Sequence, residues 1–326
     1  MSATERTERT ERTEGAGNEP VPPLPGVLDV HAHYVTPALR AALEAAGHGR
    51  PDGMPAIPDW SPEEALALMD RTGVAAALLS VSSPGVHFGD DAAARALARR
   101  VNEEGAALVA AHPGRFGLLA SLPLPDLAGA REEARYALDA LGADGIALQT
   151  QYGGRHIGDA AFEPLLGDLS ARGAVVVLHP TSPACFEAVA DGFPRPMLEF
   201  PFETARAVAG LVLGGALDRH PGIRFVVPHA GGALPVLADR IAAFALASGN
   251  DVDVYGHLRR LYYDLAGFPL PRQLPALLTL TDEEHVLYGS DFPFTPGWVV
   301  EGMAATFARG VGFARGDGVF RRFAGA

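Results

Sequence analysis

Eight short apolar runs recur between residues 27 and 293, and segments with a helical spacing of apolar residues separate them. Continuous apolar runs of this length are typical of strands buried on both faces, as in a parallel sheet. Eight such strands alternating with helices predict an α/β fold, a (β/α)8 or TIM barrel. The runs are V-L-D-V-H (27–31), A-A-A-L-L-S-V (75–81), F-G-L-L-A-S-L-P (116–123), G-I-A-L-Q-T (145–150), A-V-V-V-L-H-P (174–180), F-V-V-P-H-A-G-G (225–232), L-Y-Y-D-L-A-G (261–267) and V-L-Y-G-S-D-F-P (286–293).

The alternative to a barrel is a doubly wound open sheet. Such sheets carry G-x-G-x-x-G after their first strand, and no such motif follows residues 27–31. We therefore favour one barrel over residues 23–326. Two long connections, residues 34–60 and 181–203, follow the first and fifth strands on the catalytic side of a barrel. We expect these loop insertions to cap the C-terminal face.

The N-terminal segment, residues 1–22, is predicted to be a disordered tail. Residues 4–14 read T-E-R-T-E-R-T-E-R-T-E, a polar repeat that offers no apolar face to bury. The segment also lacks the apolar core of a secretory signal, and the chain has no apolar run long enough to cross a bilayer. We therefore expect a cytoplasmic protein without a membrane partner.

Charge and the choice of basic residue exclude several functions. The net charge of −13 argues against a nucleic-acid partner, because phosphate binding needs clustered cations. All 26 basic residues are arginine. The absence of lysine excludes a Schiff-base lysine, a phosphate-loop lysine and a carbamylated lysine that bridges two metals.

Histidine and aspartate stand at four of the predicted strand ends, where the chemistry of a barrel collects. His31 and His33 end the first strand, His179 the fifth, His229 the sixth and Asp291 the eighth. A lone histidine there is more often a simple hydrogen-bonding residue. Five such side chains at one level are costly to bury unless a cation orders and neutralises them. The pattern predicts a metal site, and imidazole with one carboxylate favours Zn²⁺, with Mn²⁺, Fe²⁺ or Co²⁺ as substitutes.

These motifs resemble the amidohydrolase superfamily. The resemblance rests on H-x-H in the first strand, L-H-P in the fifth, H-A-G-G in the sixth and G-S-D-F-P in the eighth. Within the superfamily the chain is similar to the branch of α-amino-β-carboxymuconate-ε-semialdehyde decarboxylase. Two stretches, W-S-P-E-E-A-L-A-L-M-D-R-T-G-V (60–74) and S-V-S-S-P-G-V (80–86), resemble the 6-methylsalicylate decarboxylases of that branch.

The resemblance implies that His31, His33, His179 and Asp291 bind one divalent metal, with Zn²⁺ favoured and Mn²⁺ as the alternative. It also implies catalytic roles for His229, as an acid/base or water-orienting group, and for Asp291, as a proton carrier. The expected substrate is a small aromatic carboxylic acid, an ortho-hydroxybenzoate such as 6-methylsalicylate, or a related unsaturated acid.

Two further residues are assigned to the substrate by the resemblance. Arg240 lies eleven residues after His229, at the spacing of an arginine that reaches across a homodimer interface to the neighbouring substrate carboxylate. A helical surface arginine is the alternative. Phe294 stands where some aromatic acid decarboxylases carry tyrosine, which favours a less polar pocket.

Asp264, on the seventh strand, either supports the site or makes a buried hydrogen bond unrelated to it.

The same five strand-end residues also suit hydrolysis. A metal-bound water with a lowered pKa could attack a lactone or amide carbonyl. The fold and the metal-binding residues are the same for a hydrolase with one metal ion and for a carboxy-lyase. Both functions therefore remain open at this point. Arg240 and the stretches between residues 60 and 86 favour decarboxylation. A non-catalytic metal-bound barrel is the third possibility.

Overall fold

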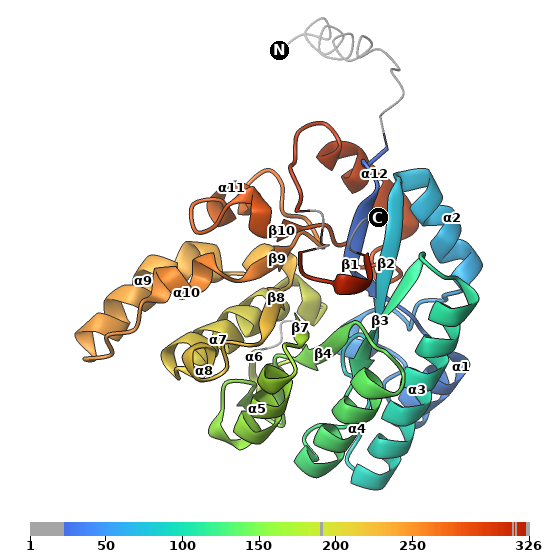
Figure 1. Ribbon diagram of the computed structural model, residues 1–326, viewed down its shortest axis with the longest axis horizontal. Helices are drawn as coiled ribbons and strands as arrows, with labels where there is room; N and C mark the ends of the chain where they lie inside the picture. Colours follow the sequence, from blue (N-terminus) through green and yellow to red (C-terminus); the bar gives the residue numbers. More distant parts are fainter. Residues whose placement is uncertain (1–22, 190–191, 315, 317, 324–326) are drawn as a thin grey trace, which may run out of the picture.

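A barrel of eight parallel strands forms the centre of the molecule (Figure 1), in a computed structural model that describes residues 23–189, 192–314, 316 and 318–323. Barrel neighbours follow one another in chain order, as the sequence predicts. The predicted tail, residues 1–22, lies outside the described residues. The strands are β1 (Val27–His33), β2 (Val74–Ser80), β3 (Phe116–Ser121), β4 (Gly145–Gln149), β7 (Val175–His179), β8 (Arg224–Val227), β9 (Tyr262–Asp264) and β10 (Val286–Leu287).

Helices surround the strands on the outside of the barrel (Figure 1). None of the helices in the described part of the chain is long and apolar enough to cross a membrane. A short hairpin of β5 (Gln151–Tyr152) and β6 (Arg155–His156) follows β4. The helices are α1 (Pro37–Ala45), α2 (Pro62–Thr72), α3 (Asp91–Ala111), α4 (Leu127–Asp139), α5 (Glu163–Ala171), α6 (Phe186–Val189), α7 (Glu199–Leu213), α8 (Ala216–Arg219), α9 (Leu234–Ala247), α10 (Val254–Arg259), α11 (Gln273–Leu277) and α12 (Gly297–Phe307).

Helix α2 illustrates how local sequence sets the ends of these elements. The Ser61 side chain accepts a hydrogen bond from the Glu64 amide at 3.2 Å, and Pro62 occupies the first turn, where it loses no helical hydrogen bond. Gly73 ends the helix with a left-handed φ of 81°. Strand β2 begins at the next residue, so the chain turns from helix to barrel within one residue.

The barrel closes between β1 and β10. The Val30 amide donates to the Tyr288 carbonyl at 2.9 Å, and beyond β10 the Asp291 amide donates to the His31 carbonyl at 2.8 Å. The chain after β10 therefore keeps running beside β1. This pairing brings Asp291 to the level of His31.

The buried carboxylate of Asp29 adds a second link across the same seam. Its Oδ1 accepts the amides of His31 and Ser290, each at 3.1 Å. Asp29 is 3% exposed, and burial raises its pKa to about 7. Because these amides belong to the first and last strand segments, one side chain holds together the two ends of the barrel wall.

A change of phase in β1 turns its histidines inward. Leu28 and Val30 pack in the core inside the barrel, whereas Ala32 belongs to the core outside it. The pairing of β1 with β2 shifts register between Asp29 and Ala32. Such irregularities re-aim side chains near active sites. Here, the side chains that face the barrel interior change from even to odd positions just before the H-A-H motif.

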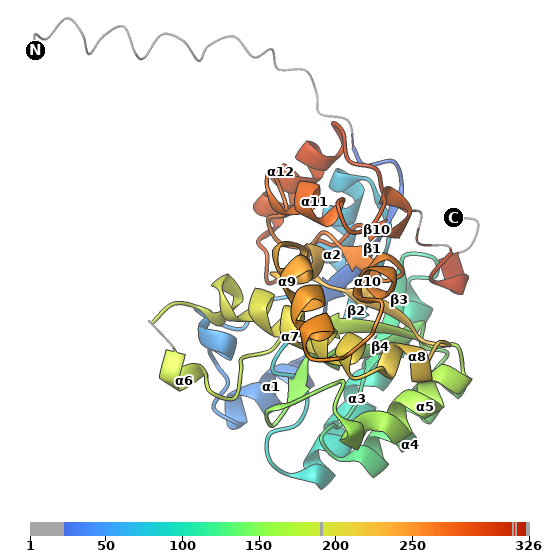
Figure 2. The same ribbon diagram turned by 90° about the vertical axis from the view of Figure 1, so that its left-hand side faces the viewer.

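The two long connections lie beside one another at the C-terminal face, on the left in Figure 2. The connection after β1 contains the short helix η1 (Pro51–Gly53), which contacts η3 (Arg195–Met197) in the connection after β7. At the opposite end, Phe320 and Phe323 pack into the core inside the barrel. One end of the barrel is therefore filled by apolar side chains, and the other carries the loops.

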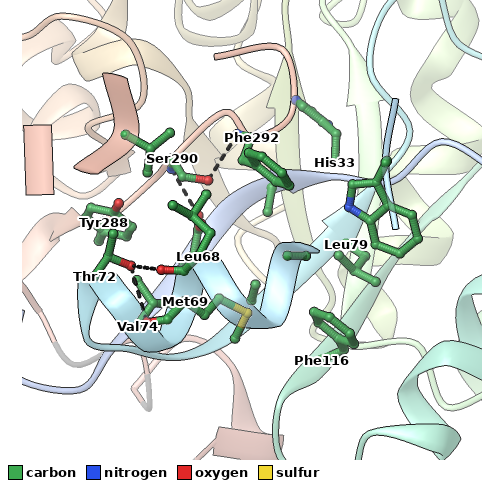
Figure 3. Close-up of a pocket in the computed structure, with 16 residues that line it drawn as sticks. His33, Leu68, Met69, Thr72, Val74, Leu79, Phe116, Tyr288, Ser290 and Phe292 are labelled. Atoms are coloured by element: carbon green, nitrogen blue, oxygen red, sulfur yellow. Dashed lines mark hydrogen bonds between the residues drawn. The ribbon is translucent and has the colours of Figure 1, made fainter. Parts of the chain in front are cut away.

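A small apolar cavity lies on the outer side of β1 and is not the functional site. Leu68, Met69 and Phe116 are among its lining residues, with His33 at its edge (Figure 3). Its volume is about 20 Å³, enough for about one water molecule. The space that concerns function lies at the C-terminal face.

Candidate metal centre

Three imidazoles and one carboxylate converge at the C-terminal end of the barrel. One nitrogen or oxygen atom from each of His31, His33, His179 and Asp291 lies within 4.8 Å of the others. The histidine rings of this cluster have centroids 4.9–5.3 Å apart. The cluster therefore contains the four residues that the resemblance assigns to the metal.

Hydrogen bonds fix which nitrogen of His31 and His33 faces the centre of the cluster. His31 Nδ1 lies 2.9 Å from a carboxylate oxygen of Asp264, which can only accept, so Nδ1 carries the proton. Ser80 Oγ donates to the Ala32 carbonyl and therefore accepts from His33 Nδ1 at 2.9 Å. In both rings Nε2 is therefore the nitrogen that faces the centre of the cluster.

His179 follows the same arrangement. Its Nδ1 lies 2.7 Å from the Pro180 carbonyl oxygen and must donate to it. The Nε2 atom faces the cluster, 3.4 Å from the Ser82 hydroxyl. Each of the three histidines thus has its outer nitrogen bound by an acceptor and its inner nitrogen available, as expected of metal-ligating histidines.

Asp291 completes the cluster from the loop after β10. Its Oδ1 lies 3.2 Å from His33 Nε2, and its Oδ2 accepts from the Thr295 hydroxyl at 3.2 Å. The backbone of Asp291 is left-handed, with φ 59°, a conformation that aspartate tolerates better than most residues. Burial opposes its charge, but the neighbouring imidazoles of His33 and His31 outweigh burial and lower the pKa of Asp291.

The chemistry of this donor set fits a divalent cation. The Nε2 atoms of His31 and His33 are buried and have no hydrogen-bond partner, a costly state for imidazole nitrogens. Burial lowers the pKa of His33, and that of His179 lies well below its usual value because of burial and the other imidazoles. Neutral imidazoles and an ionised carboxylate are the forms that bind metal.

His31 shows how strongly this site favours positive charge. Burial disfavours its protonated form, but the negative charge of Asp264, with those of Asp291 and Asp29, outweighs burial and raises its pKa to about 9. A metal ion bound to His31 Nε2 would supply the positive charge that a second proton on the ring supplies when no metal is bound. Asp264 therefore supports the site, which resolves the two alternatives left open by the sequence.

His229 lies beside the cluster. Its ring centroid is 4.9 Å from that of His31 and 6.3 Å from that of His179. Its backbone amide donates to Asp264 Oδ1 at 3.0 Å. Burial, and then the charge of His31, lower its pKa to about 4. The side chain lines the adjoining cavity, so it faces any molecule bound there.

That cavity has a volume of about 560 Å³ and a mainly apolar wall. Pro51 and Met54 come from the connection after β1, and Pro196 and Met197 from that after β7. Both long connections thus line the site, as predicted. Phe294 forms another part of the wall, with its ring centroid 5.5 Å from that of His33.

Arg240 does not line this cavity in its own chain. It is exposed on α9, with its guanidinium 4.9 Å from the centre of the Phe244 ring. Of the described residues that line the cavity, Asp52 and Asp291 carry the carboxylates, and none is an arginine. Residues that the sequence did not single out include Asp52, Thr295 and Gln273.

Comparison with known proteins identifies the family. The chain matches the amidohydrolase family over residues 28–323. The chain belongs to this family. It is 40% identical over 278 residues to a 6-methylsalicylic acid decarboxylase of Penicillium expansum, an alignment that covers 82% of this chain and 85% of the relative. The predicted resemblance to the decarboxylase branch is confirmed.

Two solved structures show the same architecture. The crystal structure of an amidohydrolase superimposes with a TM-score of 0.85 at 35% identity, covering 90% of this chain and 96% of the other. The second structure is a 5-carboxyvanillate decarboxylase of Novosphingobium aromaticivorans, complexed with manganese and 4-hydroxy-3-methoxy-5-nitrobenzoic acid. It superimposes with a TM-score of 0.74 at 20% identity, covering 91% of this chain and 97% of the other. The second likeness concerns the fold alone.

We predict that Asp264→Asn weakens metal binding by about 10–100-fold. If the amide oxygen keeps the hydrogen bonds to the His229 and Ala266 amides, its NH2 group faces His31 Nδ1. His31 then carries its proton on Nε2, which blocks ligation. Metal affinity is measured by titration of the stripped protein against a competing chelator.

Asp218→Asn is the matched control, since Asp218 pairs with the buried His257 at 3.2 Å, away from the cluster. It should keep the affinity of the unmodified protein. Equal affinity in the Asp264 and Asp218 variants would contradict the role assigned to Asp264.

Proposed function

We propose that this protein is a metal-dependent, non-oxidative decarboxylase of an ortho-hydroxybenzoate of the 6-methylsalicylate type. The observation that carries the proposal is a His3Asp cluster opening into an apolar cavity with room for one small aromatic acid. The 40% identity to a 6-methylsalicylic acid decarboxylase supports this choice of substrate over a hydrolase substrate.

His31, His33, His179 and Asp291 would hold one divalent cation. When bound, the cation supplies positive charge that orients the substrate's carboxylate and phenolic oxygen and stabilises charge during the reaction. The nitrogen-rich donor set favours Zn²⁺. Mn²⁺ is the alternative, and the manganese in the Novosphingobium enzyme supports it.

The chain's own residues would carry the proton and hold the ring. Asp291, ionised at rest, first takes up a proton that His229 relays from water, and then delivers it to the ring carbon that bears the carboxylate, so that this carbon temporarily leaves the aromatic system. The bond to the carboxylate then breaks, its electron pair restores the ring, and CO2 departs. His229, beside the cluster and facing the cavity, assists and relays a replacement proton from water. Phe294 contributes an apolar wall suited to a methylated ring.

A homodimer would supply the arginine side chain that the described cavity wall lacks. Helix α9 exposes Val236 and Phe244 on the surface that carries Arg240, and exposed apolar side chains of this kind mark interaction sites. In a symmetric dimer, Arg240 of each subunit would reach the substrate carboxylate in the other. The carboxylate then meets a guanidinium, which binds it through charge-assisted hydrogen bonds.

Incubation of Zn²⁺- or Mn²⁺-loaded protein with 6-methylsalicylate should give a product lighter by one CO2, measured by mass spectrometry. Removal of the metal with a chelator should abolish turnover, and either cation should restore it. Ortho-hydroxybenzoates without the methyl group and a set of lactones serve as comparison substrates. A lactone product heavier by one water, with 6-methylsalicylate unchanged, would contradict the proposal and make the protein a hydrolase.

Arg240→Ala should lower kcat/KM roughly 10–100-fold through loss of a charge-assisted hydrogen bond, with an unchanged metal content. Mixing Arg240→Ala with the inactive His179→Ala should restore about a quarter of wild-type activity, because about half of randomly mixed dimers then contain one complete site. Arg309→Ala, which removes another exposed arginine, is the control. Wild-type kinetics for Arg240→Ala would make Arg240 a simple surface residue.

A further inference from the structure

The turn that carries His229 has an unfavourable backbone conformation. His229 and Ala230 both have left-handed backbones, with φ of 54° and 51°, and Gly231 and Gly232 follow with φ of 81° and 59°. Each left-handed residue other than glycine costs roughly 1–2 kcal/mol. Such a turn persists only where its surroundings hold it.

Two side chains hold this turn from opposite ends of His229. The His229 amide donates to Asp264 Oδ1. The His229 carbonyl oxygen accepts from Gln273 Nε2 at 2.6 Å, and the Gly232 carbonyl oxygen accepts from the same nitrogen at 2.9 Å. Because both partners of Gln273 are carbonyl oxygens, the NH2 group of its amide must face them.

The position of Gln273 suits this role. It is the first residue of α11, a short helix outside the barrel wall, and lines the cavity beside His229. Both hydrogen bonds of its side chain go to the same turn, and the structure gives it no other partner within the described residues. The turn also requires glycine at residue 232, because a Cβ atom there would lie 2.4 Å from the Pro201 carbonyl oxygen.

We propose that Gln273 is a positioning residue that fixes the imidazole of His229 for catalysis. The inference rests on the proposed function, in which His229 acts on the substrate. Gln273 itself takes no part in the chemistry and acts only through His229. The two hydrogen bonds compensate for the strain of the turn and thereby set where the His229 ring points. Displacement of a catalytic group by about 1 Å can cost on the order of 100-fold in rate.

Gln273→Leu keeps most of the side-chain volume and removes the donor. We expect kcat to fall about 10–100-fold, while KM and the metal content stay close to those of the unmodified protein and the melting temperature falls by only a few degrees, because two hydrogen bonds to the turn are lost. Gln273→Glu should be at least as impaired, because an ionised carboxylate cannot donate to the two carbonyls. Asn250→Ala, which removes an amide-to-carbonyl hydrogen bond on the surface, should leave kcat unchanged.

A double-mutant cycle with His229→Ala separates positioning from a general structural role. If Gln273 acts through His229, adding Gln273→Leu to His229→Ala leaves kcat where His229→Ala put it. A further fall by the full factor of the single variant would overturn the inference. So would loss of metal or a large drop in melting temperature in Gln273→Leu alone.

The crystal structure of Gln273→Leu provides a test that does not depend on turnover. We expect a displaced His229 ring and otherwise unchanged positions of His31, His33, His179 and Asp291. An inactive His229→Ala together with a fully active Gln273→Leu would refute the positioning role and leave the proposed function standing. A fully active His229→Ala would instead refute the role of His229 in the proposed function, and the positioning role with it.

Discussion

The carboxylate of Asp264 connects the His31 ring to the turn that carries His229, and the positions of both depend on it. One oxygen accepts from the His31 ring, and the other accepts the His229 and Ala266 amides. Asp264 is fully buried, so its charge must be compensated nearby. The compensation lies on the side of His31, where the ring carries either a proton or a bound cation. A single buried charge thereby orients one histidine of the cluster and anchors the turn that carries His229.

The barrel provides the rigid frame for these contacts. Asp29 and the backbone pairing after β10 keep Asp291 level with His31, and the change of phase in β1 turns His31 and His33 toward the interior. The long connections then form an apolar wall around a polar centre. An apolar wall of this kind lowers the local dielectric constant, which strengthens the electrostatic interactions within the site.

The strands and the convergence of His31, His33, His179 and Asp291 could be predicted from sequence because their signals are local. Apolar runs that end in histidine or aspartate indicate a metal site once several of them meet at one end of a barrel. Asp264 gave no such signal, since a single aspartate in a strand has the same appearance whether or not it supports a ligand. Gln273 gave none, because its partners are backbone carbonyls 44 and 41 residues away in the chain. The expectation that Arg240 reaches a neighbouring subunit depends on a second chain and stays a prediction.

Decarboxylation at this centre requires that a proton enters the same ring carbon from which CO2 departs. The most direct measurement is turnover of 6-methylsalicylate by the metal-loaded protein in deuterated water, followed by NMR of the phenolic product. We expect one deuterium in the product, located at the ring carbon that carried the carboxylate, and release of CO2 in equal amount. A product that retains the carboxylate, or carries deuterium only at other positions, would contradict decarboxylation by protonation of that carbon.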